Sequence, residues 1–136
     1  MLKLKPITLA LSLSLVLAFA WSRIDVIAPV ELTESAMLET FARINNYTQT
    51  NQAIPLTLQV LPRREGYDNR TTDGWGRPLH YRVGEDGIIT LTSFGADGKA
   101  GGRGEDADIF KSYHSKRPDG SLWAGAGMWI VEAKVK

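Results

Sequence analysis

The residues best suited to chemistry form one acidic, glycine-rich stretch. Within twelve residues it carries two basic side chains and four carboxylates, namely Asp97, Glu105, Asp106 and Asp108. Five glycines between Gly95 and Gly104 let the backbone fold back and turn carbonyl oxygens inward. Carboxylate and carbonyl oxygens on a flexible backbone are the ligands that Ca²⁺ prefers. The stretch therefore indicates either a calcium loop or a solvated turn whose acids face water.

Two known calcium-loop patterns fail on this stretch. An EF-hand loop needs acids at its first, third and fifth positions, but Gly98, Lys99 and Ala100 follow Asp97. Residues 101–106 match the GGxGxD unit of a calcium β-roll, yet that fold needs tandem copies and the sequence has one. The stretch is therefore neither of these loops.

The remaining residue types give no support for catalysis. The sequence has no G-x-S-x-G, no H-E-x-x-H and no phosphate-binding loop. Its two histidines, His80 and His114, stand alone, and we expect both at the surface. A hydrolase that used the acidic loop as a catalytic metal site would need an open metal position and a nearby base. We therefore expect a protein that is not an enzyme and has no small-molecule substrate.

Composition divides the chain into two halves of one domain-sized sequence. All 13 glycines among the 136 residues lie at or after Gly66, so the first half can run in continuous helix and the second must turn often. Lys plus Arg is 16 and Asp plus Glu is 15, and this balance argues against a nucleic-acid partner. A hydrophobic content of 43% is too high for a disordered tail. The absence of cysteine excludes a disulfide scaffold and a cysteine-based zinc site.

The N-terminus has the pattern of an export segment. Lys3 and Lys5 precede an apolar run over residues 7–21, and Ala18-Phe19-Ala20 offers a small-x-small cleavage site. The alternative is an uncleaved membrane anchor, although these fifteen residues would make a helix of roughly 22 Å against a hydrocarbon core of roughly 30 Å. In both cases the basic start keeps the N-terminus inside.

We therefore expect the rest of the chain outside the cytoplasm, in the periplasm. It would be soluble after signal cleavage, or anchored to the inner membrane by residues 7–21. The domain organisation predicted from these features is a signal peptide or short anchor over 1–20, a connector over 21–30 and a globular domain over 31–136.

The element expected after the connector is an amphipathic helix over 33–48. Thr33 can cap its N-terminus, and Glu34 suits the positive end of the helix dipole. Helical spacing predicts an apolar, core-facing side and a solvent side. The apolar side comprises Met37, Leu38, Phe41, Ile44 and Tyr47, and the solvent side Glu39, Arg43 and Asn46. Residues 56–61, between two prolines, fit either a short strand or one helical turn.

The elements around the acidic stretch are expected to be β-strands. Residues 79–83 and 88–93 are β-type runs, and Gly84-Glu85-Asp86-Gly87 between them predicts a hairpin. Residues 94–108 form the glycine-rich loop, and residues 128–135 predict a final strand. One helix followed by a small antiparallel three-stranded sheet is an α+β fold. We expect four aromatic residues to fill its core: Trp75, Tyr81, Trp123 and Trp129. A turn is predicted at Arg117-Pro118-Asp119-Gly120.

Four segments in order carry a resemblance to a known family. They are DGWGRPLHY over 73–81, LTSFGADG over 91–98, Gly101-Gly102, and Asp106-Ala107-Asp108-Ile109. Together they resemble the globular domain of the major pseudopilin of the type II secretion system. That family shows D-x-W-G-x-P, a strand ending in S-x-G-A-D-G, a glycine-rich loop and a closing acid before Ile. With the preceding helix, which fits a pilin-like architecture, the resemblance covers about half of the chain.

The resemblance implies a structural calcium ion in the loop. Transferred by position, the side chains of Asp97, Asp106 and Asp108 would be ligands. The backbone carbonyls of Phe94 and of Arg103 or a neighbour would complete the shell. The resemblance also implies a non-enzymatic protein whose partners are proteins of a secretion apparatus. It favours the calcium loop over the solvated turn.

The first half of the sequence departs from that family. Pseudopilins begin with a short leader that ends in Gly and is followed by Phe-Thr-Leu-x-Glu, whereas this sequence has no Gly before Gly66 and no acid before Asp25. We therefore expect that the chain is not processed and polymerised as an ordinary pseudopilin.

The favoured hypothesis is a calcium-binding, pseudopilin-like protein associated with type II secretion. The alternatives are a free-standing periplasmic binding module that reuses the fold outside any filament, and a small metal-dependent hydrolase.

Overall fold

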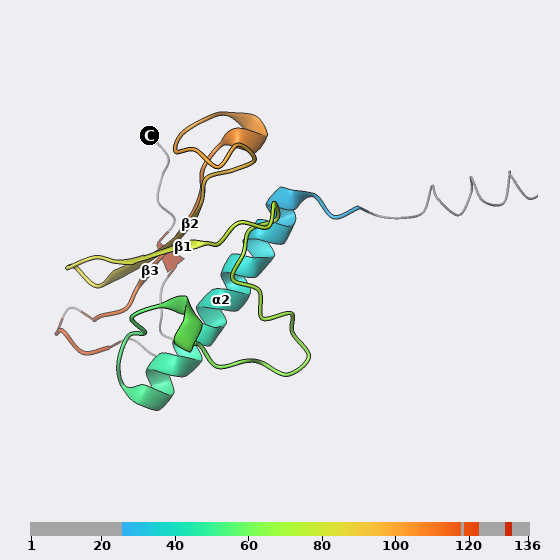
Figure 1. The fold of residues 1–136 in the computed structure, drawn as a ribbon. Coiled ribbons are helices and arrows are strands. Elements are labelled where there is room, and N and C mark those ends of the chain that lie inside the picture. Colours follow the sequence, from blue (N-terminus) through green and yellow to red (C-terminus); the bar gives the residue numbers. More distant parts are fainter. Residues whose placement is uncertain (1–25, 118, 123–129, 132–136) are drawn as a thin grey trace, which may run out of the picture.

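One long helix packs against one face of a small antiparallel sheet (Figure 1). A computed structural model of the chain describes residues 26–117, 119–122 and 130–131. The predicted export segment over 1–20 lies outside the described residues, as do Trp123 and Trp129. Within the described ranges, no helix is both long and apolar enough to cross a membrane. The predicted α+β class is confirmed.

The helix, α2 (Pro29–Asn51), begins earlier and ends later than predicted. Proline is compatible with a first helical turn because the N–H that it lacks would have no partner there. Thr33 is therefore not the N-cap but lies inside the helix, where its hydroxyl donates to the Pro29 carbonyl at 2.8 Å. Gln52, with a φ of 52°, ends the helix in the left-handed conformation. The last two residues of the predicted connector thus belong to α2.

The core lies between α2 and the sheet. Met37 and Ile44 are fully buried, and the ring of Phe41 stacks on Tyr113 with a centroid distance of 3.6 Å. Leu38, predicted on the core side, is instead 51% exposed. The buried apolar residues are Ala36, Met37, Ile44, Leu58, Leu61, Leu79, Ile89, Leu91 and Tyr113.

Arg43 departs from the helical pattern in the opposite direction from Leu38, because it is buried where exposure was expected. It was predicted on the solvent side, yet it is only 5% exposed. Its guanidinium donates to the carbonyls of Leu61, Pro62 and Asn69 at 3.2, 2.8 and 3.0 Å. The connection over 61–70 covers this side of α2, and burial is acceptable because the side chain's donors find partners.

The sheet has three longer strands and a two-residue fourth strand at its edge. In order they are β1 (His80–Val83), β2 (Ile88–Ser93), β3 (Ile109–His114) and β4 (Ile130–Val131). All neighbours are antiparallel, with Tyr81 opposite Leu91 and Leu91 opposite Lys111. The strands β1 and β2 were predicted, but β3 was not, since Lys111 and Ser112 interrupt its apolar pattern. Its pairing with β2 overrides that weak local signal.

Three short connections were also predicted from the sequence. The hairpin over 84–87 joins β1 to β2, and the turn over 117–120 is closed by the Gly120 N–H on the Arg117 carbonyl at 2.9 Å. Residues 56–61 contain a 3₁₀ helix, η1 (Leu58–Val60), which is the helical-turn alternative. The strand β4 contains the described residues of the predicted strand over 128–135.

Candidate functional site

The acidic loop connects β2 to β3 and extends from one end of the sheet (Figure 1). It begins after Ser93 and ends before Ile109, as predicted. The loop folds back on itself because the Ala96 N–H donates to the Glu105 carbonyl at 2.7 Å. A 3₁₀ turn, η2 (Gly104–Asp106), forms its second half.

Two glycines permit this folding because the loop backbone passes close to itself there. A Cβ on Gly95 would lie 2.5 Å from the carbonyl carbon of Asp106, and one on Gly102 would lie 2.4 Å from the Asp106 carbonyl oxygen. Their φ angles, 61° and 86°, are also in the left-handed region. Only glycine meets both demands without strain, so part of the glycine pattern serves the shape of the loop.

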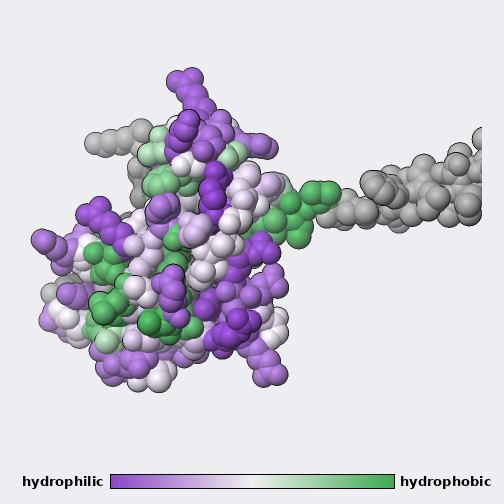
Figure 2. Space-filling model, in the orientation of Figure 1, coloured by the Kyte–Doolittle hydropathy of each residue, from purple (hydrophilic) through white to green (hydrophobic). Residues whose placement is uncertain are grey.

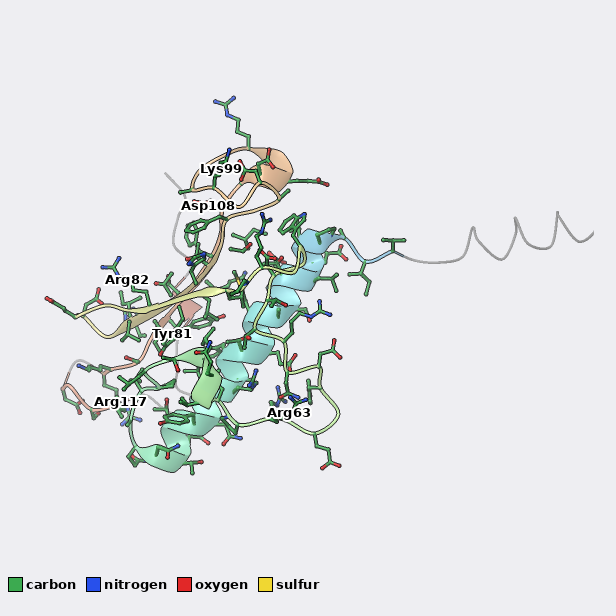
Figure 3. All side chains as sticks on the ribbon, viewed as in Figure 1. Arg63, Tyr81, Arg82, Lys99, Asp108 and Arg117 are labelled. Atoms are coloured by element: carbon green, nitrogen blue, oxygen red, sulfur yellow. The ribbon has the colours of Figure 1, made fainter. Side chains whose placement is uncertain are left out.

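The three carboxylates predicted as metal ligands all lie on this loop, in different surroundings. The exposed Asp97 accepts the Lys99 N–H on Oδ1 at 2.9 Å. The half-buried Asp108 accepts the Gly101 N–H on both carboxylate oxygens, at 3.0 Å each. Asp106 is exposed on η2. Figure 3 shows Lys99 and Asp108 together at this end of the molecule.

The two carbonyls predicted as metal ligands lie at the start of the loop and between Asp97 and Asp106. Phe94 is half-buried at the start of the loop, with its ring 4.5 Å from that of His80. The carbonyl of Arg103 accepts the Asp106 N–H at 3.2 Å, as part of the 3₁₀ turn. Both carbonyls thus belong to the same folded loop as the carboxylates.

The loop supplies donors that suit a hard cation, although its carboxylates do not converge. Within the part of the chain that the structure describes, no three acidic, histidine or cysteine side chains are grouped to hold a metal ion. A carboxylate that accepts one N–H keeps further lone pairs, so Asp97 and Asp108 retain the capacity to bind a cation. The residues therefore fit Ca²⁺ by donor chemistry.

A buried carboxylate beside the loop was missed by the sequence analysis. Asp73 is 3% exposed and begins the turn over 73–77. Its Oδ1 accepts the N–H groups of Trp75 and Arg77 at 3.0 and 2.9 Å, and its Oδ2 accepts the Ser93 hydroxyl at 2.7 Å. An aspartate followed by Gly-x-Gly is a local signal for such a turn.

Arg77 extends from this turn to the acidic loop. Its Nη2 donates to the carbonyls of Gly95 and Ala96, the latter at 2.9 Å. Its Nε lies 3.7 Å from Asp73 Oδ2. A cationic side chain of the protein itself therefore lies against the main chain of the acidic loop. The sequence pattern contained Arg77 but gave no sign of this contact, which depends on how two separate segments meet.

The aromatic residues predicted for the core divide between two environments. Tyr81 packs against the core and donates its hydroxyl hydrogen to the Pro55 carbonyl at 2.7 Å. Trp75 is half-buried and outside the core, with Arg77 Cζ 6.0 Å from its ring. Of the histidines predicted at the surface, His80 is exposed and His114 is half-buried.

The large exposed apolar residues lie outside the acidic loop. On the face in Figure 2, hydrophobic surface covers the region of β1 and η1 and the start of α2. Large exposed apolar residues of these regions are Leu56, Val60, Val83, Val26 and Ile27. The elements β1 and η1 border a groove of about 220 Å³ lined in part by Leu58, Leu79 and Tyr81. The described lining of this groove has no charged residue.

Comparison with known proteins identifies the family to which this arrangement belongs. A family model described as "Type II secretion system (T2SS), protein G" matches residues 34–112. The match covers more than half of the chain and runs from the first turns of α2, through the turn over 73–77 and the whole acidic loop, into β3. Among curated proteins, none matches the chain at a significant level.

Proposed function

The chain belongs to the protein G family of type II secretion systems, and on that premise we propose that it is a non-enzymatic, calcium-binding, pseudopilin-like component of protein export across the envelope. The observation that carries the proposal is the family match over residues 34–112, because it includes both the core helix and the acidic loop. Its partners are proteins of the secretion apparatus.

The proposed calcium ligands are those expected from the sequence. The side chains of Asp97, Asp106 and Asp108 and the carbonyls of Phe94 and Arg103 all belong to one folded loop. Bound Ca²⁺ would supply positive charge and bonds to several oxygens at once. The proposal is supported by donor type and by the closed shape of the loop.

Electrostatics gives calcium a physical role in this loop. Four acids against two basic residues leave a formal charge of −2 over 94–108. Mutual repulsion of these carboxylates opposes the close folding of the loop, and a cation that neutralises them converts binding free energy into folding free energy. We thus propose that calcium stabilises the folded loop and takes no part in catalysis.

The proposed location is the periplasmic side of the inner membrane. The apolar run over 7–21 would act as a cleaved signal or as a short anchor, and either leaves the globular domain outside the cytoplasm. N-terminal sequencing of the exported protein separates the two: a start at Trp21 indicates cleavage, and an intact Met1 indicates an anchor.

Titration calorimetry with Ca²⁺ on the purified globular domain tests the metal assignment. Asp97→Asn is the informative variant, because an amide oxygen can still accept the Lys99 N–H while the charge is lost. Its matched control is Glu105→Gln on the same loop, since Glu105 is exposed and is not a proposed ligand. We expect Asp97→Asn to weaken binding at least tenfold and Glu105→Gln to leave it nearly unchanged. Equal affinities for all three proteins would contradict the ligand assignment.

Association with the secretion apparatus is tested by cross-linking in intact cells, followed by purification of the tagged protein. We expect other components of the type II system among the cross-linked proteins. A free-standing periplasmic module would instead give none of them and would be released in full with the soluble periplasmic fraction.

A further inference from the structure

The contact between Arg77 and the acidic loop uses several atoms of the guanidinium group. Nη2 donates to the carbonyls of Gly95 and Ala96. Nη1 lies under Gly98, where an added Cβ would be only 2.4 Å away, and Gly98 has a φ of 69°. Arg77 therefore contacts the loop at three of its first five residues, immediately around Asp97.

Asp73 orients the guanidinium group of Arg77. Its Nε makes no hydrogen bond within the described residues but faces Asp73 Oδ2 at 3.7 Å. Asp73 is itself immobilised by its three donors, which come from Trp75, Arg77 and Ser93. A buried carboxylate with fixed hydrogen bonds provides a rigid, charged support for the arginine.

The turn that carries Asp73 and Arg77 is fixed to the start of α2. The Gly74 N–H donates to the Thr33 hydroxyl at 2.8 Å. A Cβ on Gly74 would lie 1.9 Å from the Pro29 carbonyl oxygen, so the turn and the helix are in direct backbone contact. The support for Arg77 is thus continuous with the core helix.

We propose that Arg77 is a positioning residue that holds loop 94–108 closed before any metal ion binds. The donors of Arg77 occupy the carbonyls of Gly95 and Ala96. These two carbonyls are therefore engaged by the arginine, and neither is a proposed calcium ligand. The loop is preorganised, so less ordering entropy is lost when a cation binds.

The second part of this inference rests on the proposed function. If the loop binds Ca²⁺, Arg77 raises the affinity by keeping Asp97 and the carbonyl of Phe94 in place, even though it is itself a cation. The gain from preorganisation exceeds the repulsion because Asp73 neutralises the guanidinium at 3.7 Å.

Amide hydrogen exchange in EDTA tests the first part without any metal. We compare the wild-type globular domain with Arg77→Met, which keeps the apolar stem but removes every donor. The reporters are the loop amides of Ala96 and Gly101, which donate to Glu105 and Asp108. We expect their exchange to accelerate at least tenfold, while the amides that pair β2 with β3 exchange as in the wild type.

Two further variants separate positioning from general destabilisation. Arg77→Lys keeps a charge beside Asp73 but lacks the planar fork, so we expect it to restore global stability and only part of the loop protection. Arg82→Met is the matched control, because Arg82 is an exposed arginine on β1 (Figure 3). Unchanged loop exchange in Arg77→Met, or equal acceleration in Arg82→Met, would overturn the inference.

Calcium titration of the same variants then tests the second part. We expect Arg77→Met to raise the Kd for Ca²⁺ at least tenfold. A Kd equal to that of the wild type would overturn the affinity claim while leaving the calcium site intact. A wild-type protein that binds no Ca²⁺ would instead overturn the proposed metal function and the affinity claim, and exchange in EDTA would still decide whether Arg77 closes the loop.

Discussion

Two irregular connections in this fold are each held by an arginine, yet they differ in charge. The connection over 61–70 has three arginines and two acids, and Arg43 is buried against its carbonyls. The loop over 94–108 has two basic residues and four acids, and Arg77 holds it from outside. Carbonyl groups of the first connection accept hydrogen bonds from the buried Arg43. The second connection keeps a formal charge of −2 from its excess of carboxylates. The comparison predicts that a bound cation would stabilise the second connection and not the first.

The largest loss of stability is expected from replacing Arg43, which contacts the connection over 61–70. Burial lowers the pKa of its guanidinium, while Glu39 raises it, and the group remains charged with three carbonyl partners. Arg43→Ala would leave these carbonyls without their donors, and we expect a loss of about 4 kcal/mol in the free energy of unfolding.

Urea unfolding measures this loss, and it should be the same with Ca²⁺ and with EDTA. The control is Arg63→Ala on the same connection, where the exposed Arg63 (Figure 3) should change stability by about 0.5 kcal/mol at most. If the two variants lose equal stability, Arg43 does not hold the connection.

Gly95 provides the corresponding test of the acidic loop. Gly95→Ala forces a Cβ to within 2.5 Å of the Asp106 carbonyl carbon at a positive φ, so we expect a loss of about 3 kcal/mol. Gly101→Ala has a positive φ as well, but open space around its Cβ, and should cost about 1 kcal/mol. Thermal unfolding of the two variants isolates the close approach of the backbone. Equal losses would mean that conformation alone, and not contact with Asp106, requires glycine.

Alkaline unfolding should report on the core and not on the acidic loop. Burial raises the pKa of Tyr113 to about 12, and likewise that of Tyr81. Since an unfolded tyrosine ionises near pH 10, stability from these groups is complete below pH 10 and falls as the pH rises toward 12.

For the fully buried Tyr113 the slope is about 1.4 kcal/mol per pH unit. Tyr113→Phe should remove that part of the slope, measured by urea unfolding from pH 9 to 11.5. Stability at pH 7 should change little, because the Tyr113 hydroxyl has no hydrogen-bond partner among the described residues. An unaltered slope in Tyr113→Phe would exclude this residue as the source of the pH dependence.

Local signals predicted the acidic loop and the two strands before it, β1 and β2. Glycine spacing and the β-type runs set the limits of the hairpin over 84–87 and of the loop over 94–108, because turns depend on residues close in sequence. The candidate carboxylates followed from the same stretch. The family resemblance, based on Asp73–Tyr81 and the loop, is confirmed by the match over 34–112.

Long-range contacts account for what the sequence did not predict. The strand β3 depends on pairing with β2. Arg43 was predicted to face solvent because helical periodicity contains no information about a distant connection that folds over the helix. Thr33 looked like a helix cap, whereas Pro29 starts the helix one turn earlier. Asp73 and Arg77 act between segments about twenty residues apart, so their roles emerge only when turn and loop are placed together.

Differential scanning calorimetry of the globular domain in Ca²⁺ and in EDTA tests the central claim most directly. At a Ca²⁺ concentration a hundredfold above Kd, binding contributes about 2.7 kcal/mol, which corresponds to a rise in Tm of roughly 10 °C for a domain of this size. We predict that rise for the wild type and for Glu105→Gln, and its loss in Asp97→Asn. Identical melting curves in Ca²⁺ and in EDTA would contradict the proposal that Ca²⁺ stabilises the loop over 94–108.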